Sequence, residues 1–286
     1  MEVIMKVGIV GLGLIGGSMA KAYKEAGHTV LGFDRNPVPQ GYAEMNRIVD
    51  GKLTVENAGE CELILVALYP QAAVEYMKEI SPHLGRNTVL MDLCGIKKEV
   101  CDAGFALAAQ YGFVYAGGHP MAGNRFSGIK YASADLFEGS PMVLVPGKTD
   151  DIALLTKLKE LLAPAKFSHL SVTTAEDHDA RIAYTSQLAH VVSNAYIKSP
   201  TAEKHHGFSA GSYMDMTRVA PLNEIMWADL FLCNKEPLLS EIDCLIANLQ
   251  AYRDMIAADD QTGLTELLKA GRERWEEIDG PGANQK

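Results

Sequence analysis

Three glycines near the start of the chain have the spacing of a loop that binds nucleotide phosphates. Gly11, Gly13 and Gly16 form a GxGxxG pattern within KVGIVGLGLIGGSMAKAY, between a compact apolar run and a small-residue helical pattern. In such a loop the first glycine permits a tight turn, the second lets a pyrophosphate approach the backbone, and the third lets helix and strand pack closely. The helix start offers unpaired N–H groups to the phosphates. The sequence therefore predicts a dinucleotide-binding loop composed of Gly11, Leu12, Gly13, Leu14, Ile15 and Gly16.

An acidic residue follows at the position that distinguishes one dinucleotide from another. Asp34 ends the run HTVLGFD, 23 positions after Gly11. A carboxylate there accepts hydrogen bonds from ribose hydroxyls and repels a 2′-phosphate, which favours NAD over NADP. Arg35 leaves an ambiguity, because an arginine beside the ribose pocket can pair with a 2′-phosphate. A glycine-rich turn that only allows close packing is the alternative, and the joint presence of strand, loop, helix and acid argues against it.

A histidine stands at the end of a later apolar run, within FVYAGGHPMAG. His119 follows this run directly, so we expect it to emerge from a strand end that faces the cofactor. An imidazole that titrates near neutrality can take a hydroxyl proton while a hydride leaves the same carbon. We therefore predict that His119 is the catalytic base. The alternative is a histidine in a turn fixed by Pro120.

An acid and a lysine stand at another strand end. Asp92 and Lys97 lie in MDLCGIKKEV, where a predicted strand gives way to a helix. We predict that both shape the nicotinamide side of a cofactor cleft. Each also has an ordinary alternative, with Asp92 as a helix cap and Lys97 as a lysine surrounded by solvent.

Three polar residues in the second half of the chain are candidates for binding a substrate. Ser186 and His190 are four residues apart, so they share one face of a predicted helix. Arg218 lies three residues after Asp215, an arrangement in which the acid can position the guanidinium for bidentate recognition of a carboxylate. The alternatives are a buried polar pair for Ser186 and His190, and a surface ion pair for Asp215 and Arg218.

The elements that must position these residues change class along the chain. Up to about residue 172, short β-rich runs alternate with helical patterns, which predicts an α/β Rossmann-type, doubly wound, mostly parallel sheet. Beyond it the β-rich runs stop and helical periodicity continues, starting in a helix capped by Thr173 or Thr174. We predict a nucleotide-binding domain over 1–172 and an all-α helical domain over 173–286, with a disordered tail from about residue 280. A substrate cleft is expected between them, at the carboxyl ends of the strands.

Bulk composition disfavours several classes of partner. The 286 residues are 48% apolar, and the formal net charge of −10 argues against binding to nucleic acid or to acidic membrane surfaces. The longest apolar runs are far too short to span a bilayer, so we predict a cytoplasmic protein. The five cysteines lack paired CxxC spacing, and the adjacent His205 and His206 lack a further ligand at suitable spacing, so we expect no metal site.

Taken together, the motifs are similar to those of the prephenate dehydrogenase family, the NAD-dependent enzymes of tyrosine biosynthesis. The resemblance covers nearly the whole chain, because five blocks occur in order: GLGLIGGS, GGHPMAG, HDARIAYTSQLAH, DMTRVA and MWADLFLCNKEPLL. It implies oxidative decarboxylation of prephenate to 4-hydroxyphenylpyruvate, with hydride transfer from the ring carbinol to NAD. It also implies that the helical half forms a homodimer.

The same resemblance assigns roles to residues. It implies that His119 bonds the ring hydroxyl of prephenate and acts as base. It further implies that Arg218 binds a substrate carboxylate, with Ser186 and His190 lining the same pocket.

The chain departs from the family pattern in two places. Gly95 stands in DLCGIK where relatives usually have a serine that helps to orient the catalytic histidine, so we expect a backbone group, water or the Cys94 thiol to substitute. Asn124 and Arg125 follow HPMAG, where many relatives have a serine or threonine and then an acid. We keep Asn124 as a substrate-binding candidate and expect the added positive charge of Arg125 to alter carboxylate recognition.

Three other functions compete with this one. An arogenate dehydrogenase, whose substrate carries an amine in place of the keto group, has the same motifs. A β-hydroxyacid dehydrogenase shares the two-domain plan but uses a catalytic lysine on the helix after the boundary, where this chain has Ser186 and His190. A non-catalytic NAD-sensing protein would keep the glycine loop but would need neither His119 nor Arg218.

Overall fold

The chain folds into two compact units. The computed structural model describes residues 4–124 and 126–280, so the predicted disordered tail lies, apart from Gly280, outside the described residues. The first unit contains the residues up to Ile182 together with Glu224–Cys233. The second contains Ala183–Asn223 together with the residues from Asn234 onward. The sequence predicts the change at residue 172, where the strands stop, whereas the units divide ten residues later and the first also includes a helix from the second half.

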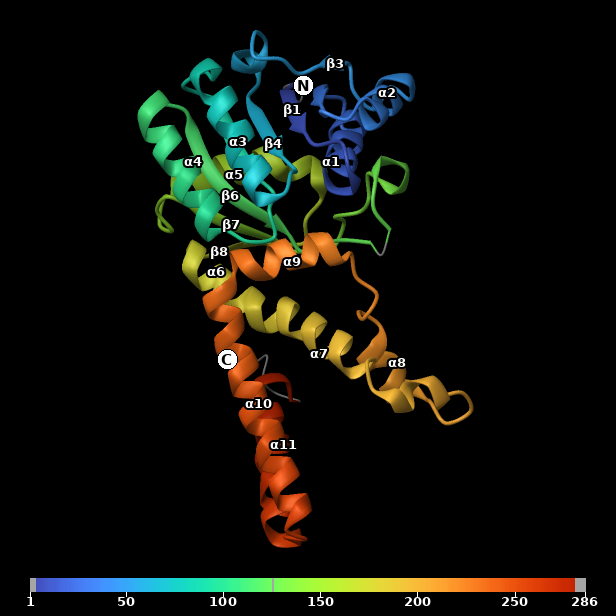
Figure 1. Ribbon diagram of the computed structural model, residues 1–286. Coiled ribbons are helices and arrows are strands. Elements are labelled where there is room, and N and C mark those ends of the chain that lie inside the picture. The colour runs from blue at the N-terminus through green and yellow to red at the C-terminus, as the bar shows by residue number, and fades with distance from the viewer. Residues whose placement is uncertain (1–3, 125, 281–286) are drawn as a thin grey trace. The chain divides into compact units, whose positions relative to one another are not determined.

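An eight-stranded sheet forms the centre of the first unit (Figure 1). Its strand order is β3-β2-β1-β4-β5-β6-β7-β8, and every neighbouring pair is parallel except β6 and β7. Strand β1 lies between β2 and β4, so the strand order extends from β1 to β3 in one direction and from β4 onward in the other. Ligands bind α/β sheets at the point where the strand order reverses in this way. The strands are Lys6–Val10, Thr29–Phe33, Gly51–Lys52, Leu63–Val66, Val89–Asp92, Val114–Pro120, Met142–Pro146 and Leu170–Val172.

The sheet confirms the predicted mostly parallel α/β class, with two details that the sequence pattern did not reveal. The strand β7 runs antiparallel to β6, with Gly117 opposite Val145, because no helix of the crossover type lies between them. The edge strand β3 pairs with β2 over only two residues, which is too short for an alternating pattern to identify.

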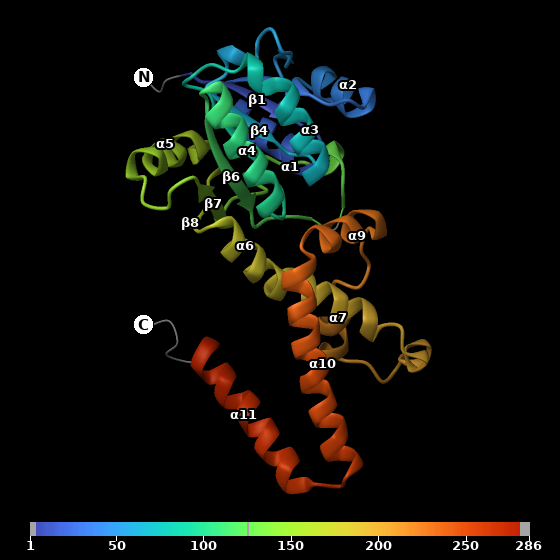
Figure 2. The same cartoon turned by 60° about the vertical axis from the view of Figure 1, so that its left-hand side comes forward.

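Helices cover both faces of this sheet (Figure 2). One apolar cluster joins the strands to α1 (Leu14–Glu25), α2 (Pro37–Met45) and α5 (Ile152–Leu162). A second cluster on the other face joins them to α3 (Pro70–Ile80) and α4 (Lys98–Tyr111). The strands are therefore buried on both sides, which explains their continuous apolar sequences.

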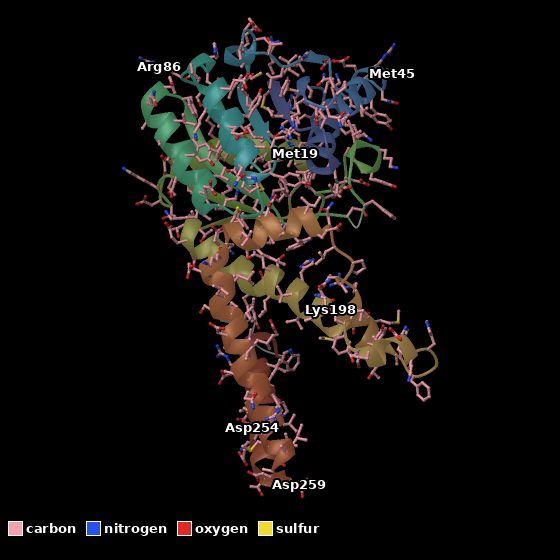
Figure 3. The ribbon with its side chains drawn as sticks, in the orientation of Figure 1. Met19, Met45, Arg86, Lys198, Asp254 and Asp259 are labelled. Carbon is pink, nitrogen blue, oxygen red and sulfur yellow. The ribbon has the colours of Figure 1, made fainter. Side chains whose placement is uncertain are left out.

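Two methionines show how sharply inside and outside differ in this unit. Met19 of α1 faces the sheet and is 0% exposed, whereas Met45 at the end of α2 is 86% exposed (Figure 3). The helix face that packs on the sheet thus buries its apolar side chains, as expected for an amphipathic helix.

Helix α6 (Ala175–Ile182) ends the main part of the first unit, and α9 (Glu224–Cys233) also belongs to that unit. The Thr174 hydroxyl accepts a hydrogen bond from the Asp177 amide at 3.2 Å, which confirms the predicted capping of this helix by a threonine.

The second unit consists of helices. A π-helical segment (Ala183–Leu188) leads into α7 (Ala189–Tyr196), which contacts α8 (Gly211–Thr217). Helices α10 (Lys235–Ala257) and α11 (Gln261–Asp279) contact each other along the chain's last described part. Among the described residues, no helix combines the length and apolar character that crossing a membrane requires.

Candidate active site

The glycine loop after β1 has the three steric properties predicted for it. Gly11 has a φ of +83°, and a Cβ there would collide with the carbonyl oxygen of Ala67. A Cβ on Gly16 would collide with the carbonyl oxygen of Gly11, so the helix can approach the loop only with glycine at this position. A Cβ on Gly13 would meet no heavy atom within 4 Å. Two of the glycines are therefore required by packing, while the third leaves space beside the backbone.

The first turn of α1 suits an anion. The helix begins at Leu14, its N-cap Gly13 forms no side-chain cap, and its first turn contains no acidic residue. Its first amides therefore point outward with the positive end of the helix dipole. Leu12, beside this turn, is fully buried, and Ile15 is partly buried.

Asp34 lies beside the loop, as the sequence predicts. Its Oδ2 accepts a hydrogen bond from the Leu12 amide at 2.8 Å, and its Oδ1 accepts one from the Asn36 amide at 2.8 Å. The backbone amide of Asp34 donates to Gln40 Oε1 at 2.9 Å. These bonds hold the carboxylate at the end of β2, next to the place where a ribose would follow the pyrophosphate. The neighbouring Arg35 is exposed.

Asp92 and Lys97 form a buried ion pair at the end of β5. Both side chains are 0% exposed, and the Lys97 ammonium contacts Asp92 Oδ2. Asp92 also accepts hydrogen bonds from the Tyr115 hydroxyl at 2.6 Å and from the Cys94 amide at 3.0 Å. Burial has the largest single effect on the pKa of Lys97 and lowers it, but the Asp92 carboxylate together with Cys94 and Cys101 raises the pKa by more, so the net shift is upward. The alternative of a solvated lysine is therefore wrong.

The alternative of Asp92 as a helix cap is also wrong. The first amides of α4, those of Lys97 and Lys98, donate to the carboxylate of Asp179 at 2.7 and 2.8 Å. Asp92 instead bonds side chains and the turn before the helix. The role predicted for Asp92 and Lys97 beside a nicotinamide stays a prediction.

His119 is the second-last residue of β6. It pairs with Val143 of β7 in the antiparallel ladder, so the alternative of a turn histidine is wrong. The ring is partly exposed, and its Nδ1 lies 2.9 Å from Nε2 of His178. Burial, followed by the neighbouring His178 and Lys97, holds the pKa of His119 well below its usual range. His119 is thus neutral at pH 7, the state that a proton acceptor requires.

Two residues that sequence reasoning did not single out continue from His119. His178 Nδ1 lies 2.7 Å from Asp179 Oδ1, and the two residues are 2% and 3% exposed. Asp179 in turn holds the first amides of α4. A chain of hydrogen bonds therefore runs from the start of α4 through Asp179 and His178 to His119. The two residues begin the block HDARIAYTSQLAH that contributes to the family resemblance, but an adjacent pair of ionisable residues early in a helix is by itself common on helix surfaces.

Gly95 faces the other side of the His119 ring. A Cβ built on Gly95 would lie 3.8 Å from His119 Nε2, so a side chain here would approach that nitrogen. The Cys94 thiol instead donates to the Leu68 carbonyl at 3.4 Å, and burial followed by Asp92 raises its pKa well above the usual range. The expectation that the Cys94 thiol orients His119 is therefore not met, because the thiol bonds elsewhere.

Asn124 follows β6 on an exposed loop, where its Oδ1 accepts a hydrogen bond from the Phe126 amide at 3.3 Å. Arg125, whose charge is expected to affect carboxylate recognition, lies outside the described residues. The place of Asn124 among the substrate-binding residues stays a prediction.

The second unit contains the other three predicted substrate-binding residues. Ser186 lies in the π-helical segment, and the His190 ring donates through Nδ1 to the Ser186 carbonyl at 2.9 Å. Both are only partly buried, so the alternative of a buried polar pair is wrong. Arg218 ends α8 and is exposed. Within 4–124 and 126–280 there is no ion pair between Asp215 and Arg218, so neither the positioning by Asp215 nor the surface ion pair is present.

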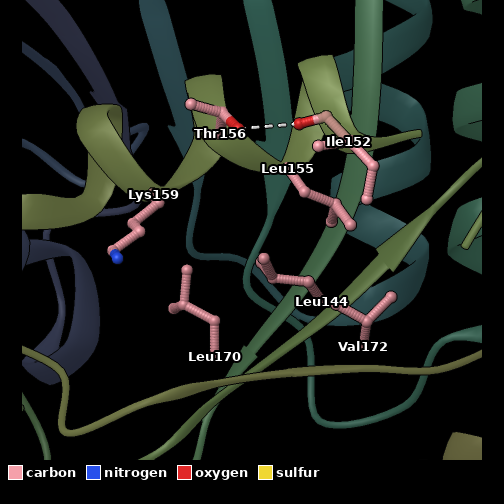
Figure 4. A pocket seen from close by; sticks show the side chains of 7 residues that line it. All are labelled: Leu144, Ile152, Leu155, Thr156, Lys159, Leu170 and Val172. Carbon is pink, nitrogen blue, oxygen red and sulfur yellow. Dashed lines mark hydrogen bonds between the residues drawn. The ribbon is translucent and has the colours of Figure 1, made fainter. Parts of the chain in front are cut away.

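A separate groove of about 240 Å³ lies beside α5 and contains none of these residues (Figure 4). Its lining is apolar apart from Thr156 and Lys159. The Thr156 hydroxyl donates a hydrogen bond to the Ile152 carbonyl at 2.8 Å. Lys159 is therefore the one ionisable side chain among the described residues that line the groove. It is lined by Leu144, Ile152, Leu155, Thr156, Lys159, Leu170 and Val172.

Comparison with known proteins gives matches along most of the chain. Residues 19–169 match the family described as "Prephenate dehydrogenase, nucleotide-binding domain", and residues 174–270 match "Prephenate dehydrogenase, dimerization domain". The first match begins after the glycine loop, so the assignment of that loop rests on its own geometry. A prephenate dehydrogenase of Lactococcus lactis subsp. cremoris is 30% identical over 280 residues, which cover 93% of this chain and 75% of the relative.

Solved structures of related dehydrogenases also match this chain. The prephenate dehydrogenase of A. aeolicus in complex with hydroxyphenyl propionate and NAD+ matches with a TM-score of 0.82 and 28% identity, covering 97% of this chain and 99% of the other. The arogenate dehydrogenase of Synechocystis matches with a TM-score of 0.79 and 26% identity, covering 95% of this chain and 100% of the other. Fold and sequence similarity thus extend over both units.

Proposed function

The chain belongs to the prephenate dehydrogenase family, and from this we propose that it is an NAD-dependent dehydrogenase that converts prephenate to 4-hydroxyphenylpyruvate. The observation that carries the proposal is the place of His119 at a strand end, bonded to His178, in the same unit as a glycine loop and an acidic residue suited to NAD. Family membership also argues against the β-hydroxyacid dehydrogenase alternative.

The chemistry divides between cofactor and protein. NAD, when bound, accepts the hydride from the ring carbon that carries the hydroxyl group. His119 takes the hydroxyl proton, for which its low pKa keeps it unprotonated at neutral pH. Loss of carbon dioxide then leaves an aromatic ring, so the protein mainly has to orient the ring and accept one proton.

The residues at the glycine loop fit NAD. The space beside Gly13 admits a pyrophosphate, and the amides at the start of α1 are available to bond it. Asp34, held by the Leu12 amide, accepts bonds from the ribose hydroxyls and disfavours a 2′-phosphate. We propose that Asp92 and Lys97 support the nicotinamide side from their buried ion pair.

Replacing Gly13 by alanine tests the cofactor proposal. Its φ of −81° suits any residue and the added Cβ meets nothing, so the melting temperature should stay unchanged. We expect the affinity for NAD to fall about tenfold or more, because the methyl group occupies the space of the pyrophosphate. Gly16→Ala is the contrasting variant, since its Cβ collides with the backbone of Gly11 and should lower the melting temperature. An unchanged affinity in Gly13→Ala would place the phosphates elsewhere.

Charged and polar residues of the second unit are proposed to bind the substrate. Arg218 is exposed and has the geometry to bind a carboxylate with two parallel hydrogen bonds. Ser186 and His190 of the same unit, and Asn124 of the first unit, are proposed to contribute further polar groups. Because prephenate carries two carboxylates, a single arginine can account for one of them.

Arogenate is the second candidate substrate, since one solved relative is an arogenate dehydrogenase. The proposal is tested by NADH formation with prephenate and arogenate in parallel, repeated with NADP+. His119→Ala should lower kcat about 1,000-fold with NAD affinity unchanged, because the variant loses its base and keeps the glycine loop. His169→Ala, at an exposed histidine of the same unit, is the matched control and should leave both unchanged. Turnover of neither substrate would refute the proposal.

We further propose that the protein is a homodimer formed through its second unit. Residues 174–270 match a dimerization domain, and several large apolar side chains of α10 and α11 are more than half exposed in the single chain. Apolar surface of this kind marks an interface. A mass of one chain by light scattering at micromolar concentration would contradict this. The exposed side chains are Ile246, Leu249, Ile256, Leu268 and Trp275.

A further inference from the structure

His178 and Asp179 are buried, and His178 contacts His119, the residue on which the proposed function depends, while Asp179 contacts His178. We infer that both are positioning residues, which hold His119 in the tautomer that carries its proton on Nδ1 and presents the lone pair of Nε2 to the substrate. This inference deepens the proposed function and rests on it, because it identifies the atom of His119 that accepts the proton.

Asp179 sets the direction of the first hydrogen bond. Its two carboxylate oxygens accept the amides of Lys97 and Lys98 at 2.7 and 2.8 Å, and backbone amides can only donate. The positive end of the 14-residue helix α4 further favours the ionised carboxylate at this place. An ionised carboxylate has only acceptors, so the 2.7 Å contact to His178 requires a proton on His178 Nδ1.

His178 transmits this direction to His119. In a neutral imidazole with a proton on Nδ1, the nitrogen Nε2 is an acceptor. With both rings neutral, the 2.9 Å contact between His178 Nε2 and His119 Nδ1 then has His119 as the donor, from Nδ1. Neutral His119 then has its lone pair on Nε2, and the arrangement extends by one imidazole the way in which an aspartate orients a catalytic histidine in serine proteases.

The Nε2 side of His119 faces Gly95, which provides no side chain to occupy this nitrogen. Cys94, next in the chain, directs its thiol to the Leu68 carbonyl. Among the described residues, the ring is bonded through Nδ1 to His178. In this chain His178 does the orienting that the family pattern assigns to a serine at the position of Gly95.

A purely structural role predicts a different result. Asp179 also holds the start of α4, so its replacement costs stability whether or not it acts on His119. Asp179→Asn tests the direction of this chain, because Oδ1 of Asp179 accepts both the Lys97 amide and the His178 ring, whereas Oδ2 accepts the Lys98 amide. An NH2 group in the place of Oδ1 gives up the Lys97 amide, keeps the Lys98 amide, forces the opposite tautomer through the chain and leaves a proton on His119 Nε2. We expect kcat/KM to fall about 100-fold or more, with NAD affinity unchanged.

Variants of His178 provide the controls. His178→Gln keeps an acceptor for the Nδ1 proton of His119 and should lose much less activity than His178→Ala, which removes it. In the double variant His178→Ala with Asp179→Asn, the second change should have no further effect on kcat, since Asp179 acts through His178. A second change that lowers kcat as much as it does alone would overturn the inference and leave Asp179 as a helix cap only.

The tautomer can also be read without any substrate. Nitrogen chemical shifts of protein labelled with 15N-histidine distinguish protonated from unprotonated ring nitrogens, and the His119 signals are those lost in His119→Gln. We expect an unprotonated Nε2 in the natural protein and a protonated one in Asp179→Asn. A proton on His119 Nε2 in the natural protein would overturn the inference. Failure of the proposed function would instead appear as an absence of turnover with both substrates, with the nitrogen shifts unaffected.

Discussion

In the first unit, Asp92, Lys97 and His178 are buried and bonded to ionisable neighbours, whereas the predicted substrate-binding side chains of the second unit are exposed or half-buried. Asp92 and Lys97 have no exposed surface and His178 almost none, while Arg218 forms no ion pair within the described residues. A group that acts on the reacting bond must be held in one position before the substrate arrives. A side chain that recognises a charged substrate can instead become fixed in one conformation when the substrate binds, at a cost in side-chain entropy.

The largest effect that tests this contrast is on stability. Lys97→Met leaves the buried Asp92 without its cation, and we expect the free energy of unfolding to fall by about 3–5 kcal/mol. Lys98→Met is the matched control, because the adjacent Lys98 forms exposed ion pairs with Asp102 and Glu176 and should cost less than about 1 kcal/mol. Urea unfolding of the protein without ligands measures both. Equal losses would show that burial does not distinguish the two lysines.

A smaller effect is expected for the exposed Arg218, and on KM in place of stability. Arg218→Ala should raise KM about 10- to 100-fold, as expected for the loss of a charge-assisted contact to a carboxylate, and leave the unfolding free energy unchanged. Arg253→Ala, at an exposed arginine of α10 that pairs with Asp254, is the control and should leave KM unchanged. A fall in kcat with KM constant would instead give Arg218 a role in the chemical step.

The smallest effect concerns pH. Burial together with His178 and Lys97 lowers the pKa of His119, so the acid limb of kcat/KM should lie below pH 6.5, the usual histidine pKa. The same lowered pKa makes the folded protein less stable in acid, because as pH falls the unfolded chain binds a proton at His119 at a higher pH than the folded chain does. The contribution of His119 is therefore present above about pH 6.5 and lost as pH falls below it. An acid limb above pH 7 would contradict the lowered pKa of His119, because kcat/KM reports the groups of the free enzyme.

Local patterns predicted the parts of the site that depend on neighbours in sequence. The glycine loop is one in part, since Gly11 has a φ of +83° and a Cβ on Gly16 would collide with Gly11, whereas the collision expected at Gly11 is with Ala67, far away in sequence. The chain of hydrogen bonds could not be predicted in this way, because His119 and His178 are 59 residues apart and Lys97 and Asp179 are 82 apart. Nothing local distinguishes these residues from solvated ones.

The burial of Lys97 escaped sequence reasoning for the same cause. Lysine is almost never fully buried unless it is paired, and its partner Asp92 is recognisable only when β5 and the following turn are in place. The reversed direction of β7 is a comparable case, since an apolar run does not reveal its orientation.

The two margins of the central sheet have a consequence for aggregation. A long unpaired strand at a sheet edge is a template on which another chain can add a strand. Here the outermost strands are Gly51–Lys52 and Leu170–Val172, of two and three residues, and the first carries a lysine. These short strands present few unpaired backbone groups to which a strand of another chain could hydrogen-bond. The sheet is thereby protected from aggregation through its edges. The helices can still expose apolar surface without placing it next to an unpaired strand.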